Sequence, residues 1–316
     1  MTRPIDTAFV LGAGLGTRLR PLTDVLPKPL IPIFGKPLIT FALDHLAAAG
    51  VRSFVINTHH LAAQFPAAFP DGLYRGLPVR LVHEPVLLET GGGIKNAEPW
   101  LGAGPFLVYS GDILTDIDVP ALIEEHFRRG NDVTLALRDT GLAAGVCLKN
   151  GRVVDIRKGP AQAGAHDFAN VSVWNPEIFR RIPPATKTSF IPVVVEWIKA
   201  GGKIGGLVLN ERSWFNVGSR HEYLAVHESI RDSGWKPLHV RDAEWPVGID
   251  PGAAVDTFAH ISGVCSIGPG CEVGRGAVVE DSILWPGTRV TADAHLRRCV
   301  ATGSMVISGR YEDTDL

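Results

Sequence analysis

Apolar and polar positions follow two different periods along the chain, and the period changes around residues 233–246. In the first part, short apolar runs rich in β-branched and aromatic residues alternate with longer stretches whose apolar positions recur every three or four residues. The short runs predict strands and the longer stretches predict helices. This alternation predicts an α/β fold with a Rossmann-like, mostly parallel sheet flanked by helices on both faces.

The predicted elements place two candidate segments at one edge of that sheet. The expected strands are 7–11, 52–57, 79–84, 105–110 and 132–138, and the expected helices are 36–50, 94–102 and 119–130. Gly50 and Gly130 end two of the helices at the C-cap position, which favours glycine. Ligands in this architecture bind beyond the carboxyl ends of the strands. The glycine-rich segment after the first strand and the acidic segment after strand 105–110 should both lie there.

The tail has a period of six. Aliphatic residues recur at Ile249, Val255, Ile261, Ile267, Val273 and Val279, and small residues precede most of them by two places. Neither a helix nor an ordinary strand has this period, whereas hexapeptide repeats of a short left-handed β-helix do. The pattern then moves by one position, to Val290 and Leu296, which we interpret as a terminal cap. The alternative is a chance aliphatic pattern in a loop-rich tail. The predicted domains are 1–235 and 246–316.

Composition limits the partners that the protein can have. The chain of 316 residues is 45% hydrophobic and 20% charged, with a formal net charge of -2, which gives no general attraction for nucleic acid or acidic membrane. No apolar run approaches the roughly 18 residues of a membrane span, and the first residues do not resemble a signal peptide. Four widely spaced cysteines indicate reduced thiols. We expect a cytoplasmic protein without nucleic-acid or membrane partners, in which anion binding is local.

The segment LGAGLGTRLRPLTDVLPKPLIP, residues 11–32, carries the main chemical signal. It is neither a P-loop nor a GxGxxG fingerprint, because Thr17 and Arg18 stand where those motifs need other residues. What remains is a strand followed by a glycine turn, whose backbone N–H groups can approach a phosphate chain. Arg18 would be a forked donor to that chain, and prolines would fix Lys28. The alternative is that both cations lie on an ordinary surface loop.

This segment resembles the N-terminal motif of the sugar-1-phosphate nucleotidyltransferases, and further motifs of that family follow in order. LLETGGGIKNAE is similar to the nucleotide-contacting loop, YSGDILTDID to the metal-binding aspartate segment, VVDIRKGP to the sugar-phosphate lysine segment, and WFNVGSRHEYLAVH to the second metal segment. The resemblance implies an enzyme that joins a sugar 1-phosphate to a nucleoside triphosphate, with Mg2+ and release of pyrophosphate. In this family a repeat tail often mediates assembly or regulation, and we expect a homo-oligomer formed through the C-terminal repeats.

The resemblance also implies roles for individual positions. It implies catalytic roles for Arg18, Lys28 and Asp112, nucleotide contacts from Leu11, Gly12, Ala13, Gly14, Glu89, Thr90 and Gly91, sugar-phosphate contacts from Lys158 and Asn170, and Mg2+ ligands at Asp112 and Asn216. Arg18 and Lys28 would hold the triphosphate and stabilise the leaving pyrophosphate. Simpler alternatives stay open: Asp112 as a cap or turn residue, residues 89–93 as a plain helix N-terminus, and Asn170 as part of a packed strand.

Some positions near these motifs fit the family less well or have a simpler interpretation. Asn216 stands where the family has an aspartate, so its amide oxygen can ligate Mg2+ but brings no negative charge. Metal affinity should fall, and a catalytically weak nucleotide-sugar-binding regulatory subunit is therefore a second hypothesis. Lys158 follows Arg157, where the family usually has glutamate. Asp116 and Asp118 match no family ligand, and we interpret both as turn or capping residues.

Motifs of two branches of the family are mixed in this chain. LETGGGI, residues 88–94, is similar to N-acetylmuramate-1-phosphate uridylyltransferases, which lack a repeat tail. IKNAE and the tail are similar to mannose-1-phosphate guanylyltransferases. We favour GTP and mannose 1-phosphate as substrates, with uridylyl transfer to a sugar such as N-acetylmuramate 1-phosphate as the alternative.

Overall fold

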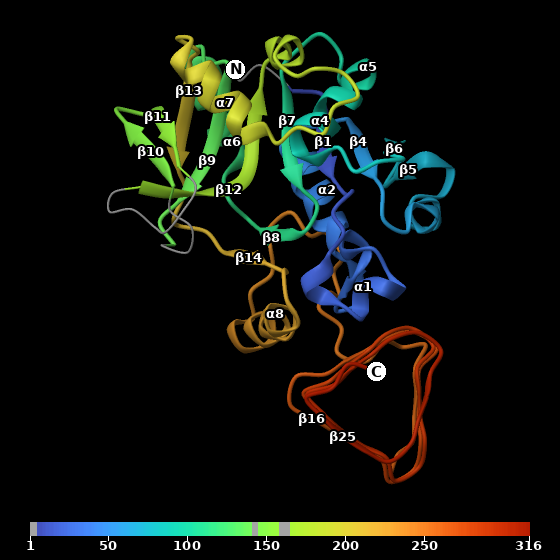
Figure 1. The fold of residues 1–316 in the computed structure, drawn as a ribbon. Helices are drawn as coiled ribbons and strands as arrows, with labels where there is room; N and C mark the ends of the chain where they lie inside the picture. Colours follow the sequence, from blue (N-terminus) through green and yellow to red (C-terminus); the bar gives the residue numbers. More distant parts are fainter. Residues whose placement is uncertain (1–4, 141–144, 158–164) are drawn as a thin grey trace. The chain divides into compact units, whose positions relative to one another are not determined.

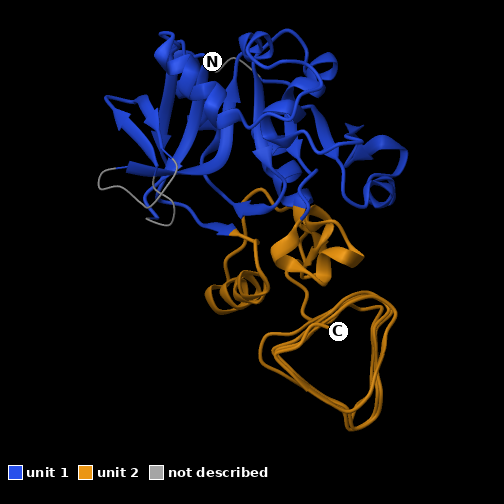
Figure 2. Ribbon diagram, viewed as in Figure 1, with its two compact units in different colours: residues 1–15, 39–215 blue, residues 16–38, 216–316 orange. Residues whose placement is uncertain are grey.

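The computed structural model describes residues 5–140, 145–157 and 165–316, which form two compact units (Figure 2). Unit 1 comprises Met1–Leu15 and Ile39–Phe215, and unit 2 comprises Gly16–Leu38 and Asn216–Leu316. The chain therefore leaves unit 1 inside the glycine-rich segment and re-enters it at the first long helix. The predicted domains stay a prediction, and these compact units divide the chain at other positions.

Unit 1 is built on a ten-stranded mixed sheet with the order β10-β11-β13-β9-β12-β7-β1-β4-β6-β5 (Figure 1). Its central strands β7, β1, β4 and β6 are parallel, as expected for buried apolar runs. Strand β12 is antiparallel to both β7 and β9, so the expected parallel arrangement holds for the central set and for the β9–β13 pair but not for the whole sheet. The strands are β1 (Thr7–Leu11), β4 (Ser53–Thr58), β5 (Leu73–Tyr74), β6 (Leu77–His83), β7 (Phe106–Ser110), β9 (Val133–Arg138), β10 (Val146–Lys149), β11 (Arg152–Ile156), β12 (Ala165–Trp174) and β13 (Ile204–Val208).

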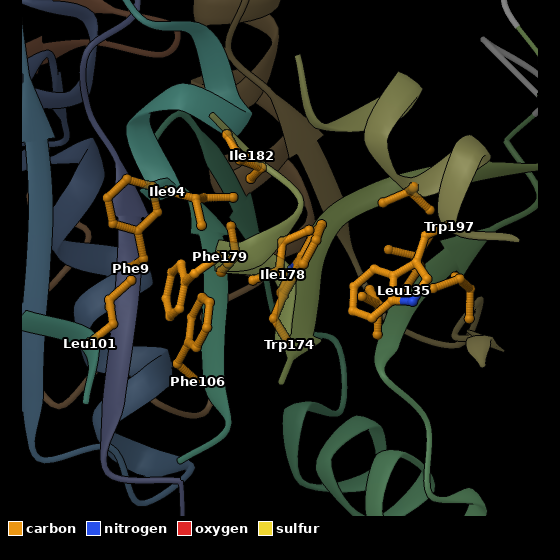
Figure 3. Close-up of a cluster of buried hydrophobic side chains, with 14 of the residues drawn as sticks. Phe9, Ile94, Leu101, Phe106, Leu135, Trp174, Ile178, Phe179, Ile182 and Trp197 are labelled. Carbon is orange, nitrogen blue, oxygen red and sulfur yellow. The ribbon is translucent and has the colours of Figure 1, made fainter. Parts of the chain in front are cut away.

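Unit 1 also contains helices, several of which pack against this sheet. They are α2 (Leu38–Ala48), α3 (Phe65–Ala68), α4 (Glu89–Asn96), α5 (Glu98–Leu101), α6 (Val119–Arg129) and α7 (Phe190–Lys199). Helix α6 packs on β9, β12 and β13, while α4 and α5 contact β1. Asp118 caps α6 by accepting a hydrogen bond from the Ala121 N–H, and Gly130 ends it with φ 57°, which confirms both capping predictions. The buried core includes the stacked rings of Phe106 and Phe179 (Figure 3).

Helix α4 begins at Glu89, before the predicted start at Ile94. The glycines of this first turn have low helix propensity, so the turn was not predicted as helical, and packing requires them there. A Cβ on Gly91 would lie 2.8 Å from the Thr188 carbonyl oxygen, and one on Gly92 would lie 2.5 Å from that of Thr186. The glycine run therefore lets a helix pack directly on a backbone segment, and this contact offsets its low helix propensity.

Unit 2 contains the hexapeptide tail, which forms coils of three parallel sheets with a triangular outline (Figure 1). The sheets are β15-β18-β21-β24, β16-β19-β22-β25 and β17-β20-β23. Their strands are β15 (Ala254–Val255), β16 (His260–Ser262), β17 (Ser266–Ile267), β18 (Glu272–Val273), β19 (Val278–Glu280), β20 (Ile283–Leu284), β21 (Arg289–Val290), β22 (His295–Arg297), β23 (Val300–Ala301), β24 (Val306–Ile307) and β25 (Arg310–Glu312). This arrangement agrees with a β-helix, and its handedness stays a prediction.

The change of register after residue 279 has a local cause. Ser262 pairs with Glu280, whereas Ser266 pairs with Ile283, so this corner is one residue shorter in the later coil. The coils then continue through β24 and β25, with Val290 and Leu296 buried in the same core as Val279. The interpretation of the shift as a terminal cap is therefore wrong. It marks a one-residue change in coil length.

The rest of unit 2 includes the segment after the glycine turn, one long helix and the connection from that helix to the coils. Its elements are η1 (Thr17–Leu19), α1 (Leu22–Val25), η2 (Lys28–Leu30), the hairpin strands β2 (Pro32–Ile33) and β3 (Lys36–Pro37), and α8 (Arg220–Ser233). The four cysteines are free thiols, and burial raises the pKa of Cys265, Cys271 and Cys299. Among the described parts of the chain, no helix combines the length and the apolar character needed to cross a membrane.

Candidate functional site

The carboxyl ends of β1 and β7 bring the glycine turn and Asp112 together in unit 1. Leu11 pairs with Ser110 across these two parallel strands, and the Gly111 N–H donates to the Leu11 carbonyl at 2.9 Å. A Cβ on Gly111 would lie 2.7 Å from that oxygen, so glycine permits this approach. Asp112 follows directly and is half-buried. The predicted nucleotide turn and the predicted metal ligand therefore share the expected edge of the sheet.

A buried polar chain fixes the glycine turn from behind. The Gly12 N–H donates to Asn57 Oδ1 at 2.8 Å, and Asn57 Nδ2 donates to Glu84 Oε1 at 2.7 Å. The other Glu84 oxygen accepts the Leu88 N–H at 2.9 Å, just before α4 begins. Asn57 and Glu84 are 2% and 0% exposed. This Asn57–Glu84 brace links the ends of β1, β4 and β6 to the first turn of α4, and it uses the Gly12 amide within the protein.

Sequence reasoning did not identify the brace. Its signal is the position of the two residues: Asn57 lies near the carboxyl end of β4, and Glu84 directly follows β6. Polar residues at the ends of neighbouring parallel strands lie at the edge where ligands bind. A Cβ on Gly93 would lie 2.7 Å from Glu84 Oε1 and 2.8 Å from Asn57 Nδ2. The third glycine of α4 therefore makes room for the brace.

A small cavity in unit 1 collects three of the predicted contact residues. It has a volume of about 40 Å³, and Leu11, Thr90 and Asn170 contribute to its lining together with Ser110 and Trp174. Asn170 has φ 62°, and the β12–β9 register shifts between Phe168 and Ser172. Asn170 therefore lies at an irregularity within the continuous strand β12 and contributes to the cavity lining.

Two further predicted nucleotide contacts, Glu89 and Gly91, do not line the cavity. Gly91 is packed against the backbone at Thr188, and the Glu89 carboxylate is 3.6 Å from the Lys187 ammonium at an exposed position. Asp116 accepts the Ser213 N–H at 2.8 Å and thereby connects β8 (Ile113–Thr115) to the chain entering β14 (Trp214–Asn216). Lys158 lies outside the described residues.

The segment with the two predicted catalytic cations belongs to unit 2. Gly16 has φ 63°, and a Cβ there would lie 2.7 Å from Thr23 Cγ2 and 3.2 Å from Lys28 Cβ. The Thr23 hydroxyl donates to the Gly16 carbonyl at 3.0 Å. Lys28 is 7% exposed, whereas Arg18 is exposed. The loop is thus closed on itself, and the position of its backbone determines where the Lys28 ammonium lies.

Arg18 and Asn216 converge on Gly218, also in unit 2. A Cβ on Gly218 would lie 2.8 Å from Arg18 Nη2, 2.8 Å from Asn216 Nδ2 and 2.9 Å from Glu222 Oε2. Glu222 belongs to a capping box with Ser219 and also accepts the Gly218 N–H at 2.9 Å. The Asn216 amide donates to the Glu222 carboxylate at 3.4 Å. An asparagine is suited to this carboxylate, which an aspartate would repel.

The predicted catalytic set is thus distributed over both units. Leu11, Gly12, Ala13, Gly14 and Asp112 are parts of unit 1, whereas Arg18, Lys28 and Asn216 are parts of unit 2. Across the residues that the structure describes, no cluster of three or more histidine, cysteine, aspartate or glutamate side chains is arranged to hold a metal ion. Hard oxygen donors of the kind that Mg2+ prefers include the half-buried Asp112 carboxylate in unit 1 and the Asn216 amide in unit 2.

Comparison with known proteins identifies the class to which this fold and these motifs belong. The family model described as "Nucleotidyl transferase" matches residues 7–233. The chain belongs to the nucleotidyl transferase family, which confirms the family and the enzyme class predicted from the motifs. The crystal structure of HddC from Yersinia pseudotuberculosis has the same fold, with a TM-score of 0.60 and 22% identity over 70% of this chain and 97% of that one.

Two kinds of curated relative are similar to the chain over most of its length. A mannose-1-phosphate guanylyltransferase of Mycobacterium tuberculosis is 32% identical over 305 residues, which cover 94% of this chain and 84% of the relative. An N-acetylmuramate alpha-1-phosphate uridylyltransferase of Caulobacter vibrioides is 33% identical over 250 residues, which cover 74% of this chain and 100% of the relative. A Neisseria meningitidis protein of the second name is 48% identical over 118 residues, 37% of this chain and 51% of the relative.

Proposed function

We propose that this protein transfers a nucleotidyl group from GTP to mannose 1-phosphate, making GDP-mannose and pyrophosphate. The observation that carries the choice of substrates is the extent of the similarity. The guanylyltransferase of Mycobacterium tuberculosis matches 94% of the chain, so its similarity reaches into the repeat tail. The uridylyltransferase of Caulobacter vibrioides is matched in full by 74% of the chain.

In the proposed reaction, an oxygen of the sugar 1-phosphate attacks the α-phosphorus of the triphosphate and pyrophosphate leaves. Both reactants are anions, and two unit charges 4 Å apart repel by about 1 kcal/mol in water and about 4 kcal/mol at an effective dielectric of 20. Arg18 supplies a forked guanidinium and Lys28 a compact ammonium to the triphosphate. These cations offset the repulsion and stabilise the charge that develops on the pyrophosphate.

Mg2+ is the cofactor in this proposal, and the Asp112 carboxylate and the Asn216 amide oxygen would hold it. The ion supplies positive charge that polarises the phosphate oxygens. Asp112 fits this role because it is partly exposed at the carboxyl end of β7. The Asn216 amide nitrogen is engaged by Glu222, which leaves the amide oxygen to face a cation.

The residues that line the small cavity of unit 1 would contact the nucleotide and the sugar. Thr90 and Asn170 provide a hydroxyl and an amide, and Leu11 and Trp174 provide apolar walls. Such a mixture suits the edge of a sugar or base, whose hydroxyl and amide groups need defined partners. The Asn57–Glu84 brace holds the neighbouring glycine turn in place. Lys158 is proposed as the contact to the sugar phosphate, and the repeat tail as the site of homo-oligomer formation.

Two other functions have a specific observation in their favour. The 48% identity to the Neisseria meningitidis uridylyltransferase favours UTP and N-acetylmuramate 1-phosphate. Asn216, uncharged at the position of a predicted metal ligand, favours a nucleotide-sugar-binding regulatory subunit with little or no turnover.

Pyrophosphate release by the purified chain distinguishes these functions. The assay crosses GTP, UTP, dTTP, CTP and ATP with a panel of sugar 1-phosphates in the presence of Mg2+. Release with GTP and mannose 1-phosphate is the expected result, and release with UTP and N-acetylmuramate 1-phosphate would transfer the assignment to the second branch. If no pair reacts while calorimetry shows that a nucleotide sugar binds, the regulatory function replaces the proposed one.

A further inference from the structure

The hairpin β2–β3, which follows Lys28 closely in the chain, is held by side chains from far along the sequence. Three consecutive residues of the hairpin each give one backbone group to this contact. The Pro32 carbonyl accepts from the Tyr223 hydroxyl at 2.6 Å, and the Ile33 carbonyl accepts from Trp245 Nε1 at 3.0 Å. The Phe34 N–H, in a residue with φ 45°, donates to the His227 ring at 3.3 Å. Because all three bonds are to the backbone, they fix the path of the chain.

The Tyr223 hydroxyl connects this hairpin to the repeat coils. Trp285, 2% exposed at the end of β20, donates its indole N–H to the Tyr223 oxygen at 3.1 Å. The same hydroxyl donates to Pro32, so one oxygen both accepts from the coils and donates to the hairpin. Burial raises the pKa of Tyr223 and keeps this hydroxyl protonated. All of these residues belong to unit 2.

His227 is held in the tautomer that the contact needs. Its Nδ1 lies 2.8 Å from the Tyr223 carbonyl, one helical turn earlier, and therefore carries the hydrogen and donates a hydrogen bond to that oxygen. Its Nε2 is then the acceptor for Phe34. Burial lowers the pKa of His227 to about 4, so the ring is neutral at physiological pH.

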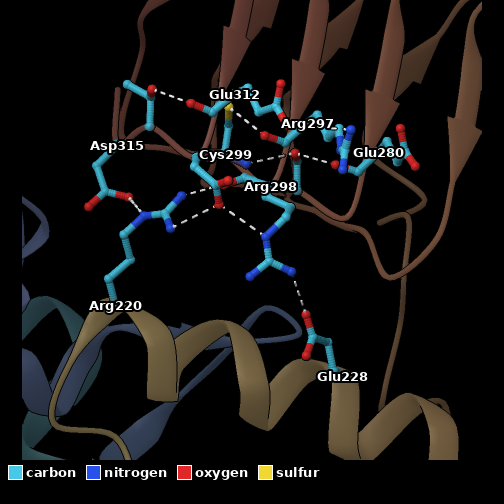
Figure 4. Close-up of polar contacts among 11 residues, drawn as sticks. Arg220, Glu228, Glu280, Arg297, Arg298, Cys299, Glu312 and Asp315 are labelled. Atoms are coloured by element: carbon cyan, nitrogen blue, oxygen red, sulfur yellow. Dashed lines mark hydrogen bonds and ion pairs between the residues drawn. The ribbon is translucent and has the colours of Figure 1, made fainter.

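Helix α8, which carries Tyr223 and His227, is anchored to the last coil at a second place (Figure 4). Arg220 Nε lies 2.6 Å from Asp315 Oδ1, and the same guanidinium donates to the Arg298 carbonyl. Arg298 in turn reaches Glu228 at 3.3 Å. The helix is thus bound to the repeats through ion pairs at one place and through Trp285 at another.

We propose that the repeat coils position the phosphate-binding loop, with Trp285 and Tyr223 as the positioning residues that transmit their support through the Pro32–Phe34 backbone to Lys28. The inference rests on the proposed function, because it takes Lys28 as a ligand of the triphosphate. Lys28 is almost fully buried, so a shift of the backbone that follows it displaces its ammonium group. This role is additional to the assembly function expected of the tail.

The test compares Trp285→Phe and Tyr223→Phe with Ser282→Ala in the full-length protein. Ser282 is a matched control because its buried hydroxyl donates to the Glu280 carbonyl and accepts from the Cys299 N–H, and both of these bonds lie within the coils. We expect Trp285→Phe and Tyr223→Phe each to raise the KM for the triphosphate about fivefold or more, because each variant loses a hydrogen bond. The KM for the sugar 1-phosphate should stay unchanged. Amide hydrogen exchange in residues 31–38 should be faster in both Trp285→Phe and Tyr223→Phe. Ser282→Ala should change neither readout.

Other outcomes of this experiment would overturn the inference or the proposed function. Unchanged triphosphate KM and unchanged exchange in folded Trp285→Phe would overturn the inference, and so would equal losses in Ser282→Ala. If Tyr223→Phe fails to fold, Trp285→Phe decides, because it keeps the Tyr223 bond to Pro32. If the unmodified protein turns over no substrate pair, the proposed function fails. Hydrogen exchange still decides whether the coils support the hairpin in that case.

Discussion

Two arginines of one loop allow the proposed phosphate contact to be tested at the scale of single residues. Arg18 converges with Asn216 on Gly218, whereas Arg20 forms an exposed pair with Asp24 at 3.2 Å. Arg18→Ala should lower kcat by about 100-fold or more, the usual effect of removing a donor that stabilises developing charge. Arg20→Ala should leave kcat within about twofold, because exposed ion pairs contribute little. Pyrophosphate release measures both, and near-normal turnover of Arg18→Ala would remove it from the site.

The Asn57–Glu84 brace can be tested by exchanging its amide and carboxylate groups between the two buried side chains. Asn57→Asp places a second carboxylate against the Glu84 carboxylate. Glu84→Gln turns an amide N–H toward one of the donors that Glu84 now accepts from, Asn57 Nδ2 or the Leu88 N–H. Each variant should therefore lose about 1–3 kcal/mol of unfolding free energy. The double variant reverses the direction of the bond, since the introduced glutamine can donate to the introduced aspartate and accept from the Leu88 N–H. Urea denaturation should show most of the loss restored. Additive losses would show that the two residues do not act as a pair.

At the scale of elements, the N-terminus of α8 explains why an asparagine stands at position 216. The Glu222 carboxylate of the capping box lies 3.4 Å from the Asn216 amide nitrogen. Asn216→Asp should therefore cost about 1 kcal/mol without a divalent cation, by repulsion between like charges. Mg2+ should restore the melting temperature more strongly in this variant than in the unmodified protein, if the position is a metal ligand.

A second asparagine beside a carboxylate provides the control for that experiment. Asn210 donates to Asp139 at 2.6 Å at an exposed position in unit 1. Asn210→Asp introduces the same repulsion away from the proposed metal ligands, so Mg2+ should not restore its melting temperature. Equal Mg2+ titrations of the Asn216→Asp variant and the unmodified protein would place residue 216 outside the metal site.

Elements with a strong local pattern were predictable, and those defined by contacts between distant segments were not. The β-branched runs of β1, β4 and β7 and the capping residues of α6 carry their structure in the local sequence. The first turn of α4 is a glycine run, stabilised only by packing against Thr186 and Thr188, so no local signal marked it as helical. The antiparallel direction of β12 likewise depends on which neighbours it meets.

At the scale of the whole molecule, the division into compact units could not be read from the order of motifs. The glycine turn and Arg18 lie in one continuous motif, yet Leu15 and Gly16 belong to different units. The reason is the set of hydrogen bonds between the hairpin backbone and the side chains of Tyr223, His227 and Trp245. A backbone N–H or carbonyl has no sequence signature, so these partners become visible only in the structure. The Gly12 contact to Asn57 was hidden for the same reason.

Two buried histidines make the stability of the whole molecule depend on pH. Burial lowers the pKa of His227 and of His239 to about 4, below the value of about 6.5 in an unfolded chain. Below pH 6.5 the unfolded chain binds protons that the folded one does not, so the free energy of unfolding falls as pH decreases from 6.5 to 4. Each histidine contributes up to about 1.4 kcal/mol per pH unit.

The contribution of one histidine can be isolated by substitution. Glutamine at position 227 does not titrate and can accept the Phe34 N–H. In His227→Gln the urea midpoint should therefore decrease less between pH 6.5 and pH 4.5 than it does in the unmodified protein. The midpoints of the two proteins should differ less at pH 7 than at pH 4.5. His221→Gln changes an exposed residue of the same helix and should leave the curve as it is. If the His227→Gln curve runs parallel to that of the unmodified protein, His227 is not held neutral against Phe34, and the hydrogen bond from the hairpin to α8 loses its support.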